Sequence, residues 1–285
     1  MNRTSADWPA PAKINRFLHV TGQRDDGYHD LQTLFQFVEP VDWLDFTLTD
    51  DGIIQREGGV DGLDADADLV VRAARALQRH SPGHWGVNIR LHKHIPVGGG
   101  LGGGSSDAAT TLVALNKLWD CRLERAQLAQ LGRGLGADVP VFIHGQAAWA
   151  EGIGDQLTPV VVDQPWLLLV DPGVAVATEA IFCDAKLTHS QAHITIRAFE
   201  DGAVRNDCEP VVVRRYPEIG AELKRLAALG PTRLTGTGAC LFAWFATRRD
   251  AEQALVQWRG KGHAWVCQAL NESPLIDRLK VEPDR

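Results

Sequence analysis

Six of the seven positions in Gly98–Gly104 are glycine, within the segment PVGGGLGGGSSDAA that spans Pro96–Ala109. Glycine lacks a side chain, so such a run lets the backbone take positive φ angles and approach a ligand closely. Alternating apolar residues in Val87–Leu91 predict a strand before this loop. Helical periodicity predicts a helix that begins at Ser106 and is capped by the side chains of Ser105–Asp107. A strand, a glycine loop and a helix N-terminus in this order favour phosphate binding.

The same glycines satisfy the dinucleotide-binding pattern G-x-G-x-x-G at Gly98, Gly100 and Gly103. Dinucleotide folds place an acidic residue about 20 positions further on, at the end of a second strand. Asp120 lies near that distance but follows the expected helix directly, which disfavours a dehydrogenase and leaves it as a minor alternative. A P-loop needs a lysine after the glycines, and a protein kinase needs H-R-D and D-F-G segments; the sequence has none of these. A flexible linker is disfavoured because a periodic strand and helix frame the loop.

The composition narrows the class of protein. The chain has 285 residues, 45% of them hydrophobic, which predicts one large or two medium globular domains. The formal net charge is −7 and no lysine and arginine block is present, so we expect no nucleic-acid partner. Five scattered cysteines without C-x-x-C spacing argue against a disulfide framework or a zinc site. No apolar stretch approaches 18 residues, so we expect no membrane association and a cytoplasmic protein.

The chain divides into two parts. A polar, proline-containing stretch at Gly154–Pro165 precedes a new apolar strand, which predicts domains of residues 1–160 and 161–285. The second part alternates helices and strands, as a small sheet with helices on one face does. The expected strands are Lys13–Val20, Trp166–Val170, Ala239–Thr247 and Ala264–Ala269, and the expected helices are Leu69–His80, Ser106–Leu118, Glu124–Leu135, Glu218–Leu229 and Asp250–Arg259.

Three further segments contain residues that could act chemically. In Pro9–Asn15, a lysine at position 13 opens an apolar strand, where a solvated strand end is an equally good interpretation. In Leu135–Phe142, Asp138 stands between a helix C-cap glycine and an expected strand that starts at Pro140; local context favours a turn-capping role. The segment LTGTGAC, residues 234–240, predicts a turn of small residues before a strand.

The order of these segments along the chain resembles the signature of the GHMP small-molecule kinases. Two further segments, GYHDLQTLF at Gly27–Phe35 and Asp207–Glu209, resemble the 4-diphosphocytidyl-2-C-methyl-D-erythritol kinase family of the non-mevalonate isoprenoid pathway. The resemblance spans most of the chain and weakens near residues 50–65 and 185–205. It implies the GHMP kinase fold, an α+β fold of two domains. The first would resemble ribosomal protein S5 domain 2 and the second would be ferredoxin-like, with the active site between them.

The implied reaction moves the γ-phosphoryl group of ATP to the tertiary 2-hydroxyl of the methylerythritol unit, with Mg²⁺ as a further cofactor. By resemblance, Asp138 takes the hydroxyl proton and Lys13 lies beside it, where its charge keeps the carboxylate ionised. No carboxylate cluster identifies metal ligands, and Ser106 is the one hydroxyl we nominate. The ATP phosphates would contact the loop residues Pro96, Val97, Gly98, Gly99, Gly100, Leu101, Gly102, Gly103, Gly104, Ser105 and Ser106.

The resemblance also implies a pocket for a substrate that carries a cytidine diphosphate group. Tyr28 and Phe182 would stack on both faces of the cytosine ring, and His29 would hydrogen-bond its edge. Asn15 and Thr178 would contact the methylerythritol and diphosphate parts. A core aromatic remains an alternative interpretation of Phe182. We expect a monomer or a weak homodimer.

One position departs from the family pattern. Asp68 stands where the family commonly has an asparagine that faces adenine; a carboxylate accepts a hydrogen bond from the adenine amine but donates none. We expect Lys93 near the same ring. The alternatives are a GHMP kinase for homoserine, mevalonate or a sugar, and a non-catalytic nucleotide-binding regulator. The presence of both Lys13 and Asp138 disfavours the regulator, since a protein that only binds nucleotide needs no base.

Overall fold

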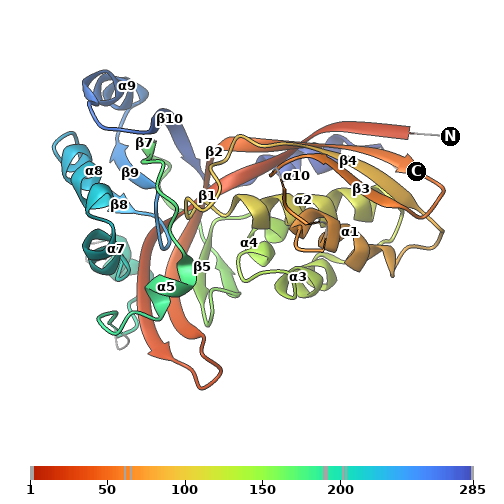
Figure 1. The fold of residues 1–285 in the computed structure, drawn as a ribbon, viewed down its shortest axis with the longest axis horizontal. Helices are drawn as coiled ribbons and strands as arrows, with labels where there is room; N and C mark the ends of the chain where they lie inside the picture. The colour runs from red at the N-terminus through yellow and green to blue at the C-terminus, as the bar shows by residue number, and fades with distance from the viewer. Residues whose placement is uncertain are drawn as a thin grey trace.

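Two long antiparallel strands, β1 (Arg3–Gln23) and β2 (His29–Thr49), run through both halves of the molecule. The computed structural model describes residues 3–60, 62–64, 66–188, 192–200, 202 and 204–283. In Figure 1 the first half of the chain lies to the right, the second half to the left, and both chain ends lie to the right. Because one hairpin enters both halves, it joins them mechanically.

Strand β1 begins ten residues before the expected start, so the prediction that Lys13 opens the strand is wrong. Lys13 lies in the middle of β1, and the register against β2 shifts between Pro11 and Ala12. A proline has no N–H group to donate, so strands tolerate it at such irregular points. This bulge is the feature that a search for a regular alternating pattern misses.

Three more strands pair with β2 beyond its contact with β1. They are β5 (Ala148–Glu151) near the start of β2, β10 (His263–Leu270) near its middle and β4 (Gly86–His92) toward its end. Strand β3 (Ile54–Gly58) pairs with β4 in parallel and extends the sheet on that side. Strand β6 (Gln156–Pro159) pairs with β5 in the antiparallel direction. Strand β10 belongs to the second half, so β2 is the seam between the two parts of the sheet.

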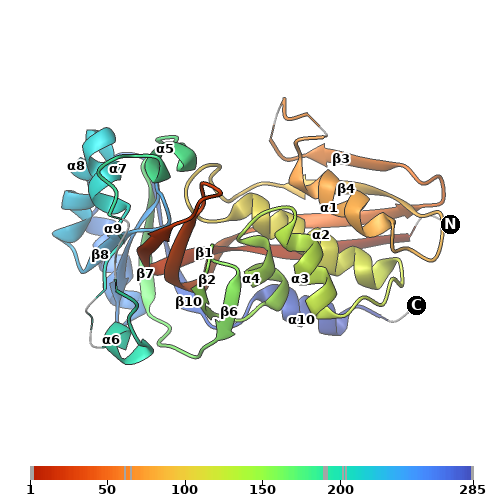
Figure 2. The same ribbon diagram turned by 90° about the horizontal axis from the view of Figure 1, so that it is seen from below.

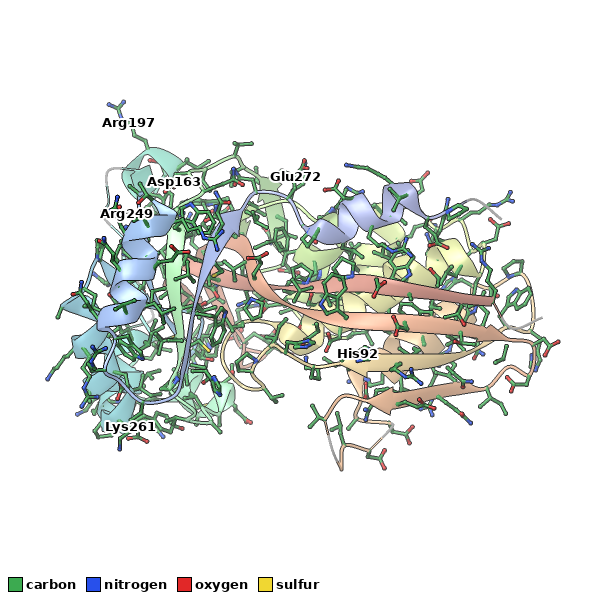
Figure 3. All side chains as sticks on the ribbon, turned by 90° about the horizontal axis from the view of Figure 1, so that it is seen from above. His92, Asp163, Arg197, Arg249, Lys261 and Glu272 are labelled. Carbon is green, nitrogen blue, oxygen red and sulfur yellow. The ribbon has the colours of Figure 1, made fainter. Side chains whose placement is uncertain are left out.

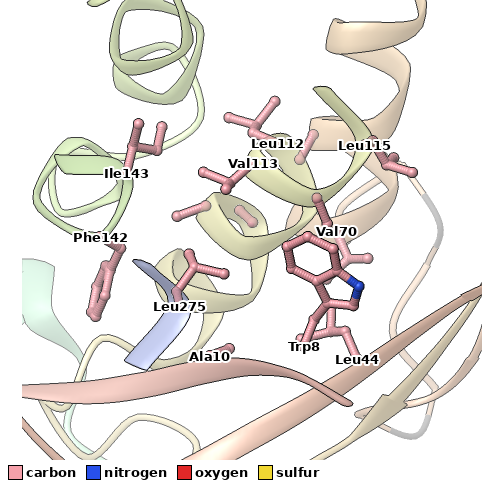
Figure 4. Close-up of a cluster of buried hydrophobic side chains, with 14 of the residues drawn as sticks. Trp8, Ala10, Leu44, Val70, Leu112, Val113, Leu115, Phe142, Ile143 and Leu275 are labelled. Atoms are coloured by element: carbon pink, nitrogen blue, oxygen red, sulfur yellow. The ribbon is translucent and has the colours of Figure 1, made fainter. Parts of the chain in front are cut away.

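Four helices cover one face of the first-half sheet, below it in Figure 1 and in front of it in Figure 2. They are α1 (Leu69–Gln78), α2 (Gly103–Leu118), α3 (Arg125–Arg133) and α4 (Val139–His144). Figure 4 shows Trp8 of β1 beside Leu44 of β2 and Val70 of α1, in the same buried cluster. Each fully buried side chain of this size contributes about 1.5–3 kcal/mol to folding. The first-half core is therefore built between β1, β2 and the helices.

Helix α4 replaces the strand expected after Asp138, so that prediction is wrong. Pro140 lies in the first turn of α4, where a missing N–H costs nothing. Val139 and Ile143 lie one turn apart and pack against Gly132 of α3, where an added Cβ would be 2.7 Å from either side chain. Tertiary packing on α3 thus selects a helix for a short apolar run that is equally compatible with a strand.

The chain returns to the first half at its end. Figure 3 labels Glu272 where the backbone crosses from β10 to α10 (Pro274–Val281). Leu275 of α10 is fully buried in the first-half core, and Glu282 pairs with Arg3 at 3.0 Å. The domain limit at residue 160 stays a prediction. Helix α10 follows that limit in the sequence but packs in the core of the first half.

The second half has the helices on one face that the sequence predicts. Along β7 (Trp166–Asp171), Leu168 and Val170 face the helices, whereas Leu167 and Leu169 face the first half. The remaining strands are β8 (Thr232–Leu234) and β9 (Leu241–Phe245), and the helices are α5 (Thr178–Phe182), α6 (Ile196–Glu200), α7 (Glu209–Arg215), α8 (Pro217–Ala227) and α9 (Arg248–Gln257). None of the helices in the described ranges is long and apolar enough to span a membrane.

Candidate active site

A cleft of about 610 Å³ lies between the two halves, with the glycine loop along its middle. Residues from β1, β2, α2, the start of α4, α5 and the turn after β8 line it. Of the residues proposed for chemistry or binding, Lys13, Asn15, Asp138, Thr178, Phe182 and the loop from Pro96 to Ser105 line this cleft. Segments more than 200 residues apart in the sequence thus meet at one site.

The backbone of the glycine loop is held from both halves. Lys13 N donates to Leu101 O at 2.9 Å, and Cys240 N donates to Gly99 O at 3.0 Å. Gly100 has a φ of +75°, and a Cβ there would be 2.5 Å from Thr235 O. Leu101 is 1% exposed and anchors the middle of the loop in the core. The loop conformation therefore requires glycine at position 100 and is held by hydrogen bonds within the protein.

Helix α2 begins at Gly103, so the expected start at Ser106 is wrong. Its N-cap is Gly102, with φ of 73° and no capping side chain; a Cβ there would be 2.9 Å from the Phe142 ring. The serines therefore lie within the first turn, with Ser105 lining the cleft and Ser106 fully buried. Ser106 Oγ has no hydrogen-bond partner among the described residues. The positive end of α2 thus faces the cleft through backbone N–H groups.

Lys13 and Asp138 lie together beside this loop. Lys13 Nζ is 3.2 Å from Asp138 Oδ2 and donates to Asn15 Oδ1 at 2.7 Å and to Gly100 O at 3.2 Å. The lysine side chain is 5% exposed, whereas that of Asp138 is 31% exposed and open to the cleft. The arrangement offers a base and a fixed positive charge next to a phosphate-binding loop.

Asn15 orients this pair. Its side-chain amide donates to Thr33 Oγ1 at 2.9 Å, and its backbone N–H donates to Thr235 Oγ1 at 3.0 Å. Thr33 and Thr235 are fully buried, and sequence reasoning assigned neither a role. Both lie inside segments that carry the family resemblance, which is the signal that could have identified them.

Lys93 lines the cleft with its ammonium group bound to two carboxylates. It contacts Asp42 and lies 2.8 Å from Asp107 Oδ2, and Asp42 also accepts from Ile95 N at 2.8 Å. Burial raises the pKa of Asp107 to about 8 although Lys93 opposes this change. Burial by itself would lower the pKa of Lys93, but the two carboxylates raise it. This group ties the first turns of α2 to β2.

Asp68 also has both carboxylate oxygens in use. Oδ1 accepts from Val70 N at 2.8 Å as the N-cap of α1, and Oδ2 pairs with the Arg56 guanidinium. The residue is 4% exposed and lines the cleft. The carboxylate that replaces the family's asparagine therefore caps a helix and neutralises an arginine.

Two of the residues expected around cytosine are in direct contact. The Phe182 ring stacks on His29 with centroids 5.2 Å apart and an interplanar angle of 22°. Tyr28 is 59% exposed near the tip of the β1–β2 hairpin. Thr178 lines the cleft and its hydroxyl is 2.9 Å from that of Thr237, a residue that sequence reasoning did not assign. The role of these residues around cytosine stays a prediction.

No group of three histidine, cysteine, aspartate or glutamate side chains in the described part of the chain is placed to hold a metal ion. Asp68, Asp107 and Asp138 are the described carboxylates that line the cleft, and Asp68 is bound to Arg56. Asp107 is bound to Lys93, and Asp138 pairs with Lys13.

Comparisons with known proteins agree with this geometry. Residues 68–146 match the family model "GHMP kinases N terminal domain", and residues 189–264 match "GHMP kinases C terminal". A crystal structure of a 4-(cytidine 5'-diphospho)-2C-methyl-D-erythritol kinase has a TM-score of 0.80 at 32% identity and covers 94% of this chain and 99% of that chain. A homoserine kinase from Cytophaga hutchinsonii has a TM-score of 0.68 at 17% identity over 94% and 96% of the two chains, a similarity of fold alone. The expected GHMP kinase fold is confirmed.

Curated relatives are similar over nearly their whole length. The 4-diphosphocytidyl-2-C-methyl-D-erythritol kinases of Chromohalobacter salexigens and Nitrosococcus oceani are each 50% identical to this chain, over 97% and 96% of it and over 95% and 98% of their own lengths. The corresponding kinase of Shewanella denitrificans is 48% identical over 96% of this chain and 97% of its own. This chain belongs to the 4-diphosphocytidyl-2-C-methyl-D-erythritol kinase family of the GHMP kinases.

Proposed function

We propose that this protein transfers the γ-phosphoryl group of ATP to the 2-hydroxyl of 4-diphosphocytidyl-2-C-methyl-D-erythritol, a step of non-mevalonate isoprenoid biosynthesis. The observation that carries the proposal is the Lys13–Asp138 pair, 3.2 Å apart and adjacent to the glycine loop in one cleft. Family membership at about half identity over nearly the whole chain supports the same substrate.

The ATP phosphates lie along the glycine loop and the N-terminus of α2. The loop residues from Pro96 to Ser105 line the cleft, and the first turn of a helix has free N–H groups that bind anions. A Mg²⁺ ion bound to the ATP phosphates would supply neutralisation of the phosphate charge, and Ser105 and Ser106 in the first turn of α2 are the nearest hydroxyls to that position in our proposal. Ser106 stays a candidate ligand only if its buried hydroxyl becomes accessible.

Asp138 accepts the proton of the 2-hydroxyl as the new P–O bond forms. The pair needs no covalent intermediate, because phosphoryl transfer asks mainly for positioning and charge stabilisation. Lys13 stabilises the carboxylate before transfer and the phosphoryl oxygens during it. Asn15 fixes the lysine through a 2.7 Å hydrogen bond.

The cytidine end of the substrate lies toward Phe182 and Thr178, at the far end of the same cleft. Phe182 offers a face for stacking on the pyrimidine, an interaction worth about 1–3 kcal/mol per base. His29 and Tyr28 complete this pocket in our proposal. The oligomeric state, a monomer or a weak homodimer, stays a prediction.

We also place the protein in the cytoplasm. All five cysteines are free thiols, as is usual in a reducing compartment. Burial raises the pKa of the Cys208 thiol to about 12, so this thiol is unreactive.

A coupled ADP-release assay with MgATP tests the proposal by comparing 4-diphosphocytidyl-2-C-methyl-D-erythritol with homoserine, mevalonate and galactose. We expect turnover with the cytidylyl substrate alone. Turnover with another alcohol would keep the kinase chemistry and refute the substrate. ATP binding without turnover on any alcohol would instead support a regulatory role.

A further inference from the structure

The segment Asn206–Glu209 contains a motif that the chemistry described so far does not use. It lies between β1 and the turn after β8, at the back of the cleft. Asp207 N donates to Leu18 O at 2.8 Å, and Asp207 Oδ2 accepts from Val20 N at 2.9 Å. The segment is thereby fixed to the distal part of β1.

Asn206 binds the turn that follows β8. Its side-chain amide donates to Leu234 O at 2.9 Å and to Gly236 O at 2.7 Å, and its Oδ1 accepts from Cys208 N at 2.9 Å. The residue is 3% exposed and does not line the cleft. Glu209 adds a hydrogen bond from Leu234 N to its Oε2 at 3.0 Å. Three of these side-chain hydrogen bonds hold the backbone of Leu234 and Gly236, and the fourth holds the Asn206–Glu209 segment itself.

The turn after β8 contacts the proposed reacting groups through Asn15. Thr235 Oγ1 accepts from Asn15 N at 3.0 Å, and Asn15 Oδ1 accepts from Lys13 Nζ at 2.7 Å. The turn also lies against the glycine loop. A Cβ added to Gly100 would be 2.5 Å from Thr235 O, and a Cβ added to Gly236 would be 3.3 Å from Gly100 O. A continuous series of contacts therefore leads from Asn206 to Lys13 and to the phosphate loop.

We propose that Asn206 is a positioning residue for phosphoryl transfer, which holds the Thr235–Thr237 turn and thereby sets Lys13 against Asp138. The inference rests on the proposed function, because it concerns the same reacting groups. Asn206 acts from outside the cleft, so it contributes to the rate of transfer and little to substrate binding. A displacement of about 1 Å at a reacting group can lower a rate about 100-fold.

The test compares Asn206→Asp with Asn116→Asp in the ADP-release assay with the cytidylyl substrate. Asn116 is a matched control, because its amide also donates to a carbonyl, Leu123 O at 3.0 Å, and its Oδ1 accepts from Leu123 N at 3.0 Å, away from the cleft. We expect Asn206→Asp to lower kcat about 10- to 100-fold with KM for the cytidylyl substrate within about threefold. The Asn116 variant should keep wild-type kcat and KM.

A second pair of variants tests the last link without introducing a charge. Thr235→Val keeps the shape of the side chain and removes the acceptor for Asn15 N, whereas Thr235→Ser keeps the hydroxyl. We expect Thr235→Val to reproduce the fall in kcat and Thr235→Ser to restore it. Thr110→Val is the control, since Thr110 is equally buried and bonds to Pro9 O at 3.2 Å.

The results separate the two proposals. A wild-type protein without turnover on the cytidylyl substrate would refute the proposed function. If the wild-type protein turns over this substrate and both Asn206→Asp and Thr235→Val keep kcat within threefold of the wild-type value, the positioning role is overturned. A loss of kcat that the Asn116 and Thr110 controls share, with equal falls in thermal unfolding midpoint, would also overturn it in favour of general destabilisation.

Discussion

The phosphate end of the cleft and its far end at Phe182 are built in opposite ways. At the phosphate end, Lys13 is 4% exposed and held by three polar partners, and the glycine loop is bound from both halves. At the far end, Tyr28 is 59% exposed and Phe182 stacks on His29. The proposed reacting groups are therefore buried and held by several partners, whereas the proposed recognition groups include an exposed ring with fewer contacts.

This difference has a physical reason. A transferred phosphoryl group needs fixed charges, because groups that must reorganise during the reaction lose most of their benefit. A stacked base gains its energy from apolar contact, which tolerates adjustment of the aromatic rings. The four predictions below test the comparison, from the largest expected effect to the smallest.

Asp138→Asn removes the base and should lower kcat about 100- to 10,000-fold, the usual contribution of a general base. The KM for the cytidylyl substrate should stay within a few fold, because the amide keeps the shape of the side chain. The assay is steady-state ADP release. Asp277→Asn, at an exposed residue on α10, is the control. Turnover of Asp138→Asn within a few fold of wild type would refute the assignment of the base.

Gly100→Ala tests how rigid the phosphate end is. The new Cβ would be 2.5 Å from Thr235 O at a φ of +75°, so we expect a loss of about 2–5 kcal/mol in unfolding free energy. Gly98→Ala is the matched control, since its φ is +74° but no atom lies within 4 Å of the added Cβ. That variant should lose only about 1–2 kcal/mol. Urea unfolding measures both, and equal losses would show that the loop is not held against the turn.

Phe182→Ala tests the recognition end. Loss of one stacking face should raise KM for the cytidylyl substrate about 5- to 150-fold, equivalent to about 1–3 kcal/mol, with KM for ATP unchanged. Tyr28→Ala should raise the same KM without lowering the thermal unfolding midpoint, because the ring is exposed. If Phe182→Ala instead destabilises the fold and leaves KM unchanged, Phe182 is a core aromatic.

The prediction with the smallest expected effect on activity concerns the pH dependence of stability. The pKa of Asp107 is raised to about 8 in the folded protein, mainly by burial, so the folded state binds more protons than the unfolded state between about pH 4 and 8. Stability should therefore fall as pH rises through this window and level off above it. Asp107→Asn should flatten this part of the curve of thermal unfolding midpoint against pH. Asp277→Asn, at an exposed residue of α10, should leave the curve unchanged.

Local sequence patterns predicted the regular elements of this protein well. The helices near α1, α3, α8 and α9 and the strand β7 lie within a few residues of their expected bounds. The errors occur where a tertiary contact overrules the local pattern. Helix α2 starts three residues early, at a glycine N-cap that lies close to the Phe142 ring, and α4 packs on Gly132 as a helix where a strand was expected.

The candidate site shows the same limit. Lys13 and Asp138 were paired through a family resemblance, since 124 intervening residues hide their proximity from any local pattern. Lys93 was expected near adenine, which stays a prediction; the structure shows that it lines the cleft and that its ammonium group binds Asp42 and Asp107. Nothing in the spacing of these three residues indicates that they meet.

By itself, the sequence determined the phosphate-binding loop, the family signature and most helices, because these depend on residues that are consecutive in the chain. Only the tertiary structure decided that Asn206 reaches the turn at Thr235, that Phe182 stacks on His29, and that Asp68 caps α1. Those contacts arise when separate elements pack, and burial then selects the partner of each polar group because an unpaired one is costly.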